Sequence, residues 1–465
     1  MDYMLPAILG LFSIACLLLS PLAKSDKSFF QGHARDGSIP GLITLTLSQV
    51  TTWIFARSLM NAAILGFYYG IWGTLAYATY YLSFLTGARI VDHIRFRHNC
   101  ENIQSFLHER FGQIGSQTYN FVIGIRLISE VFANLLVIGI LFGVAGSSAY
   151  IWAIVAFAIV ALVYSAIGGL HASLRTDFFQ MVLFMITLAV LISIALFNPQ
   201  LSISDLGFKT FELTDPGPIL IMVALLQIWS YPMHDPVMMD RGFIADRKTT
   251  WRSFHHAAWL SALCIILFGS LGVFAGAHAM EGESMNAVLT RILGDIPMLL
   301  FSVALIISAM STLDSTLSSS AKLVAVDMKV LEPTIFNGRT VMVVFMLLGI
   351  LMVFYGNKDL FSAVAVSGTA SMYLAPVIFF SVWANIKNIP VWSYLVSFLL
   401  AVTGAVLYFT ESSGYTTWFN MLFGLEHKYS KLLLISVIVL IGGSLAFAIG
   451  SMMRQRDEPT AEAIV

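Results

Sequence analysis

The sequence predicts an all-α protein embedded in a membrane, and two features of its composition support this fold class. Hydrophobic residues make up 58% of the 465-residue chain, charged residues only 11%, and the mean hydropathy is +0.83. Soluble domains carry about 25% charged residues, so a water-facing surface around a single core is excluded. Apolar runs also recur from end to end, each close to the roughly 20 residues that a bilayer-spanning helix needs. We therefore expect the lipid bilayer to be a partner of the whole chain.

Charge and cysteine content exclude several other classes. The net charge of −1 gives no reason to expect a nucleic-acid partner. Cys16, Cys100 and Cys264 are scattered, so neither a disulfide framework nor a zinc site is indicated. The first apolar run lacks a basic n-region and a cleavage site, and we interpret it as a retained span. No HExxH or GxSxG motif falls in a span, so an enzyme is not expected.

Apolar runs bounded by charged residues, Gly or Pro predict about thirteen transmembrane helices in a single domain, 1–465. The expected ranges are 3–21, 41–66, 71–92, 117–145, 149–168, 174–198, 216–234, 252–279, 297–322, 339–355, 359–383, 390–410 and 431–453. The residues after the last span, 454–465, form a short polar tail.

Lys and Arg concentrate in cytoplasmic loops, which gives a test of orientation. With the N-terminus outside, sixteen such residues, Arg241 among them, fall in inner loops and five in outer loops. An odd number of spans then places the C-terminus in the cytoplasm. The localisation that we expect is the inner (plasma) membrane of a bacterial cell.

Ionisable side chains inside spans are costly and indicate functional sites. Arg126 and Glu130 are four residues apart on one helix, so they share a face and are expected to pair. Arg57 has no acidic partner in its own helix, and it needs an acid from elsewhere or an anionic ligand.

The ninth span carries the densest polar cluster. At 100° per residue six of its hydroxyl side chains form one stripe, with Asp314 on the flank. The stripe consists of Ser308, Ser311, Thr312, Ser315, Ser318 and Ser319. Hydroxyls can bond back to the carbonyl four residues earlier. Six of them beside a carboxylate instead predict an all-oxygen site for a small hard cation such as Na⁺.

Two segments resemble the sodium:solute symporter family. Residues 310–327 are similar to the family's eighth core helix, where paired Ser and Thr precede an acidic residue. Residues 164–180 resemble its "Y..GG…A….TD..Q" signature, which joins core helices 4 and 5. The resemblance covers essentially the whole chain. Shorter segments, 50–57, 69–73 and 133–137, are similar to the urea/polyamine transporter branch.

The resemblance implies a LeuT-like fold of two inverted five-helix repeats, with sites near the midplane beside broken helices. The first repeat would span about 41–198 and the second about 216–383, with 3–21 and 390–453 as peripheral helices. Breaks are expected near Pro232 and near 367–369. The first core helix lacks a Gly or Pro at its midpoint, 48–52, to mark a break.

The resemblance also implies sodium and solute positions. The main sodium ion would bind the carbonyls of Leu47, Val50 and Ser308 and the hydroxyls of Ser311 and Thr312. A second sodium ion or a proton would use Asp177, Ser311, Asp314 and Ser315. The alternative is that Asp177 pairs locally with Arg175 or caps a helix. The solute candidates are Gln49, Thr52, Trp53, Arg57, Tyr77, Asn134, Gln227, Trp229 and Ser367. Arg57 replaces a small residue of the urea-like branch, so it could select a carboxylate or pair with Glu130.

Together these features predict sodium-coupled symport of a small polar solute by alternating access, with Na⁺ as coupling ion and no organic cofactor. The solute would be urea-like, an amino acid or a small carboxylate. A proton-coupled symporter or a uniporter of the same fold remains an alternative, as does a transporter-like sensor without net flux.

Overall fold

The computed structural model describes residues 3–32, 38–207, 211–355 and 360–457, and in these ranges every regular element is helical. The elements of the first half are α1 (Met4–Leu19), α2 (Asp26–Gln31), α3 (Leu42–Trp53), α4 (Ala56–Thr79), η1 (Tyr80–Leu82), α5 (Ser83–Val91), η2 (Asp92–Arg97), α6 (Ile103–Phe142), α7 (Ser148–Leu196) and η3 (Ile203–Leu206). The elements of the middle are α8 (Pro216–Gln227), η4 (Tyr231–His234), α9 (Pro236–Gly242), α10 (Arg247–Ala277), α11 (Met285–Leu293), α12 (Asp295–Lys322) and η5 (Leu323–Asp327). The last elements are α13 (Ile335–Tyr355), α14 (Leu360–Ser371), α15 (Leu374–Pro376), η6 (Val377–Trp383), α16 (Val391–Ser412), α17 (Trp418–Phe423) and α18 (Lys428–Asp457).

The described helices confirm an integral membrane protein. Eight of them are long and apolar enough to cross a bilayer, and the bent pair formed by 365–371 and 374–383 makes a ninth. Some hold two predicted spans: α7 has 49 residues, and a straight helix of that length would measure about 73 Å, against about 30 Å for the hydrocarbon core. Helical dihedrals break within α7 at Gly169 and within α4 at Gly70, both with positive φ. These glycines lie between predicted spans, while the number of thirteen crossings stays a prediction.

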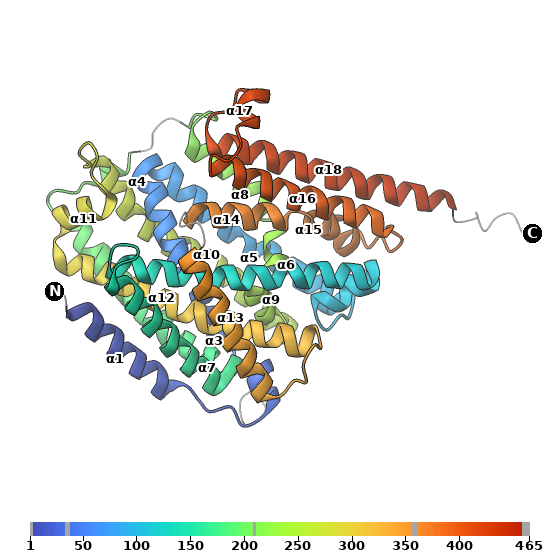
Figure 1. Cartoon of the computed structure of the whole chain (residues 1–465), viewed down its shortest axis with the longest axis horizontal. Helices are drawn as coiled ribbons and strands as arrows, with labels where there is room; N and C mark the ends of the chain where they lie inside the picture. Colours follow the sequence, from blue (N-terminus) through green and yellow to red (C-terminus); the bar gives the residue numbers. More distant parts are fainter. Residues whose placement is uncertain (1–2, 33–37, 208–210, 356–359, 458–465) are drawn as a thin grey trace, which may run out of the picture.

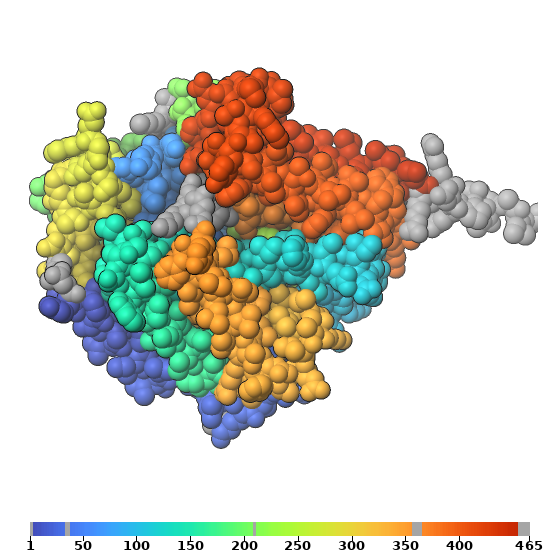
Figure 2. All heavy atoms as spheres, in the orientation of Figure 1, coloured from blue at the N-terminus to red at the C-terminus, as the bar shows by residue number. Residues whose placement is uncertain are grey.

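Peripheral and central helices are readily distinguished. Figure 1 shows α1 at one edge of the molecule and α16 packed beside α18 at the opposite edge. Helix α12 packs against α3, α6, α7 and α13, so its polar stripe lies in the interior. In Figure 2, α6, α7 and α13 cover one face of this interior.

Three breaks interrupt the central helices. Between α8 and α9 the chain runs through η4, which contains Pro232, as predicted. The bend of 41° after α14 follows Ser371, just beyond the expected 367–369. Between α3 and α4 the break lies at Ile54 and Phe55 rather than at 48–52. Neither residue is Gly or Pro, so neighbouring side chains must hold this break open.

Small residues bring α10 and α4 into close contact. A Cβ atom added to Gly272 would overlap the carbonyl oxygen of Ala63, and one added to Gly276 would overlap that of Phe67. Transmembrane helices associate closely where small residues let backbones approach, because burial in lipid supplies no hydrophobic drive between them.

Gly272→Ala is therefore expected to destabilise the protein by about 1–3 kcal/mol, the typical cost of overpacking. The measurement is the midpoint of thermal unfolding in detergent. Gly124→Ala in α6 is the matched control, since a Cβ there meets no atom within 4 Å. Equal midpoints for the two variants would contradict the close packing.

Candidate solute and cation sites

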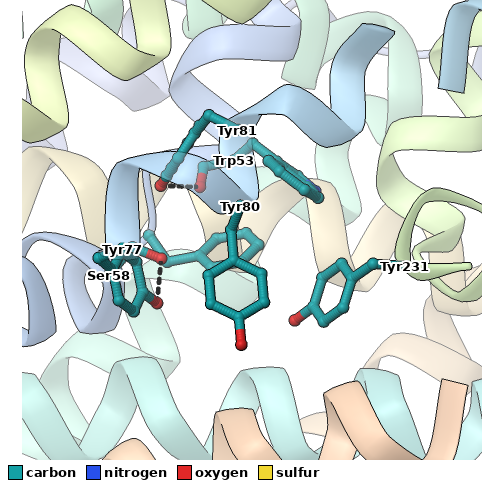
Figure 3. Close-up of a pocket in the computed structure, with 7 residues that line it drawn as sticks. Trp53, Ser58, Tyr77, Tyr80, Tyr81 and Tyr231 are labelled. Atoms are coloured by element: carbon teal, nitrogen blue, oxygen red, sulfur yellow. Dashed lines mark hydrogen bonds between the residues drawn. The ribbon is translucent and has the colours of Figure 1, made fainter. Parts of the chain in front are cut away.

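An aromatic cavity lies beside the break between α3 and α4. Its volume is about 20 Å³, room for about one water molecule. The lining residues are Trp53, Phe55, Ser58, Tyr77, Tyr80, Tyr81 and Tyr231. Figure 3 shows the Tyr231 side chain reaching from η4 toward the hydroxyl end of Tyr80, and the two ring centres lie 5.9 Å apart. These walls come from three separate segments, namely the α3–α4 break, the end of α4 with η1, and η4.

Tertiary hydrogen bonds hold the break in place. The Tyr81 hydroxyl donates to the Trp53 carbonyl at 2.9 Å, a contact drawn in Figure 3, and the Ser308 hydroxyl donates to the Ile54 carbonyl. A helix end leaves carbonyls without intrahelical partners, and buried carbonyls require another donor. Side chains of η1 and α12 supply these donors, so the cavity and the polar stripe of α12 meet at the same broken end.

The structure separates the solute candidates into three groups. Trp53 and Tyr77 line the cavity, and the Tyr77 hydroxyl donates to Ser58 at 3.0 Å. Gln49, Thr52, Arg57, Asn134 and Gln227 are buried but do not line it, and Gln227 accepts a hydrogen bond from the cavity-lining Tyr80 at 2.9 Å. The third group, Ser367 and Trp229, does not line the cavity. The Ser367 hydroxyl is hydrogen-bonded to His234 at 3.1 Å, and Trp229 is 37% exposed and packs on Phe379 and Trp383.

Four buried charges form a network next to the cavity, which we call the charge network: Arg57, Glu130, Arg126 and Asp235. Arg126 pairs with Glu130, as predicted, and also with Asp235 at 3.1 Å. Arg57 pairs with Glu130 at 3.1 Å, which is one of the two roles considered for it. Buried ion pairs require such mutual neutralisation, because an isolated charge in the interior is strongly destabilising.

Two of the proposed main-site residues contact the break directly, Ser308 through the Ile54 carbonyl and Val50 through the Ile54 N–H. Ser308, Ser311, Thr312 and Val50 are all buried, and Leu47 is 9% exposed. The Val50 carbonyl accepts the backbone N–H of Ile54 at 2.9 Å, and the Ser308 carbonyl accepts the hydroxyl of Thr312 at 2.9 Å. Each of these two carbonyl oxygens still has a second lone pair with which it could bind the proposed cation. The carbonyls freed by the break are those of Trp53 and Ile54, about one turn after Val50.

The proposed second-site residues form a continuous cluster, which we call the cation cluster: Asp177, Asp314, Ser311, Ser315 and Arg241. Asp177 accepts hydrogen bonds from Ser311 at 2.8 Å and from Ser48 at 2.6 Å. Asp314 accepts hydrogen bonds from four hydroxyls, those of Tyr164, Ser173, Thr176 and Ser315, at 2.7–3.1 Å. The structure therefore brings together the carboxylates and hydroxyls named for this site, while their role in binding a cation stays a prediction.

Arg241 lies inside this cluster, which corrects its assignment to a cytoplasmic loop. Its guanidinium is fully buried and contacts Asp177 at 3.4 Å, Ser315 at 2.7 Å and Ser48 at 3.2 Å. Arg175, the alternative partner of Asp177, is exposed. Counting Lys and Arg residues by loop assigns Arg241 to a cytoplasmic loop. This assignment is wrong because the chain continues beyond the break of the seventh span as helix α9, which contains Arg241. The useful signal is the group of charged residues that closely follows the break, Asp235, Asp240 and Arg241.

Known structures share this fold. The structure of a Na⁺-coupled sialic acid symporter, in a substrate-bound outward-open state, matches with a TM-score of 0.72 at 15% identity, over 97% of this chain and 98% of that chain. Mhp1, a nucleobase-cation-symport-1 family transporter in a closed conformation with bromovinylhydantoin bound, matches with a TM-score of 0.59 at 16% identity, over 96% and 97%. No protein-family model and no curated protein matches the sequence. The LeuT-like fold class predicted from the sequence is confirmed, and the likeness extends to the fold alone.

Proposed function

We propose that this protein is a secondary active transporter that couples the movement of a small polar solute to sodium. The observation that carries the proposal is the contact between the broken end of α3 and the hydroxyl stripe of α12, since all six stripe hydroxyls are buried. A broken helix inside a membrane protein is tolerated where it lines a cavity or binds an ion. The fold shared with two cation-coupled transporters supports the same proposal.

The proposed sodium site is the main one: the hydroxyls of Ser311 and Thr312 with the carbonyls of Ser308, Val50 and Leu47. Oxygen ligands of this kind suit a small hard cation. The nearby cation cluster contains two carboxylates and one guanidinium, and with both carboxylates ionised it carries one negative charge. One sodium ion would balance that charge, which favours a single coupling ion over two.

The same geometry defines the competing proposals. Asp314 could take up a proton in place of sodium, and a uniporter would move solute without either ion. A sensor would bind solute without net flux. We further propose that the N-terminus lies outside and the C-terminus in the cytoplasm, and that 41–198 and 216–383 form the two repeats.

The test is uptake into proteoliposomes of urea, proline, a short carboxylate and a polyamine, with an inward sodium gradient or with choline. One solute is expected to accumulate only with sodium. Ser311→Ala with Thr312→Ala should raise the sodium concentration for half-maximal uptake by about a hundredfold or more, because each of the two lost contacts to a charge contributes ~1.5–3 kcal/mol.

Ser320→Ala is the matched control, since this α12 hydroxyl only bonds back to the Leu317 carbonyl. Uptake driven by a pH gradient would support proton coupling instead. Flux that ignores both gradients would identify a uniporter, and solute binding without flux would identify a sensor.

A further inference from the structure

The charge network borders the aromatic cavity directly. The guanidinium carbons of Arg57 and Arg126 lie 5.5 and 5.7 Å from the ring centre of Phe55, which lines the cavity. Tyr231, another lining residue, lies in η4, four residues before Asp235 of the network. A solute in an expanded form of this cavity would therefore experience the field of the network at short range.

The network is electrically balanced. It holds two guanidinium groups and two carboxylates, and each of the four residues is at most 3% exposed. His234, the other titratable side chain here, is next to Asp235 in sequence and is neutral at physiological pH in its usual state. A charged solute would leave one unbalanced charge beside these buried groups, which is strongly disfavoured. An uncharged solute would leave the two positive and two negative side chains in balance.

The unused hydrogen-bonding groups describe the solute further. Among the described residues, the unpartnered atoms of the network and of the cavity include Nε and Nη1 of Arg57, Nε of Arg126, Nε1 of Trp53, Nε2 of Gln227 and Oδ1 of Asn134. Five of these atoms are donors and one is an acceptor. Buried polar groups require partners, so a bound molecule that both accepts and donates would satisfy them. The flat aromatic walls favour a planar molecule.

We propose that the charge network is a charge filter, and that it selects a planar solute without net charge, of amide or urea chemistry, over carboxylates and organic cations. This inference rests on the proposed function, because it assigns the substrate class of the same site. It makes Arg57 and Glu130 specificity-determining residues. Removing the charge of Arg57 or of Glu130 should then change the net charge of the solute that binds best.

The experiment measures binding of shape-matched planar probes at neutral pH and saturating sodium, from shifts in thermal unfolding. One series is urea, acetate and guanidinium, and the other is benzamide, benzoate and benzamidinium. The wild-type protein is expected to prefer the uncharged member by about a hundredfold, because a charge without a counter-charge is disfavoured in a buried site. Glu130→Gln should shift the preference to the anion, and Arg57→Gln should shift it to the cation.

The double variant Arg57→Gln with Glu130→Gln is the matched control, since it restores balance and buries fewer charges. It should again prefer the uncharged probe, even if a single variant fails to fold. A wild-type preference for a charged probe, no binding of either uncharged probe, or an unchanged preference in the folded single variants would overturn the inference. Uncharged selectivity without sodium dependence would refute sodium coupling alone, whereas sodium-driven uptake of a charged solute would refute the filter alone.

Discussion

Arg126→Met is expected to abolish transport and to lower the free energy of unfolding by about 3–5 kcal/mol, the usual cost of breaking a buried ion pair. Arg126 connects the network, because it contacts both Glu130 and Asp235 and is buried from solvent. After the substitution Glu130 keeps Arg57, but Asp235 loses its partner. The measurement is equilibrium unfolding by SDS titration, together with uptake in proteoliposomes.

Arg97→Met is the control for this prediction. Arg97 also pairs with an aspartate, Asp92 at 3.3 Å, but its side chain is 57% exposed, and Arg247 contacts the same aspartate. Exposed ion pairs of this kind contribute about 0–1 kcal/mol. If the two variants lose the same stability, Arg126 is not the buried connection that we describe.

Arg241→Met is expected to produce a loss of similar size, about 3–5 kcal/mol. This substitution removes the one guanidinium of the cation cluster and leaves Asp177 and Asp314 as two buried carboxylates without a cationic side chain. The Arg241→Met variant with Asp177→Asn removes a charge of each sign and should recover much of the stability. A coupling energy of about 0.5–3 kcal/mol between the two positions is the expected outcome of the double-mutant cycle.

Arg241→Lys supplies the control for charge. It keeps the positive charge but loses the forked geometry through which one side chain contacts Ser48, Ser315 and Asp177 together. It should therefore fall between the wild-type protein and Arg241→Met. Independent effects of Arg241→Met and Asp177→Asn, with no coupling, would show that the observed ion pair does not stabilise the cluster.

Local periodicity accounts for what the sequence predicts correctly. The stripe of α12 and the pair of Arg126 and Glu130 follow from helical spacing alone, because residues three or four apart share a face. The fold class follows from composition and from the lengths of the apolar runs. The stripe and the pair use information contained in one helix, the membrane class uses the whole chain, and the LeuT-like fold is implied by the resemblance of residues 164–180 and 310–327 to a known family.

The features that the sequence does not predict depend on contacts between helices. The α3–α4 break is maintained by Tyr81 and Ser308, which are distant in the chain, so no local Gly or Pro marks it. The burial of Arg241 depends on the continuation of the seventh span past Pro232 into α9. Trp229 does not line the cavity, because it packs on Phe379 and Trp383, which are distant in the chain.

The balance of the charge network also bears on how the transport cycle would respond to membrane voltage. Moving one elementary charge through a potential of 100 mV involves about 2.3 kcal/mol. The network carries two positive and two negative side chains, so moving it as a unit during alternating access would involve no net electrical work. With an uncharged solute, the driving force of the potential would act on the coupling ion and the cation cluster. In the proposed cycle, the helices that carry the network would therefore move in either direction with the same electrical work, whatever the membrane potential.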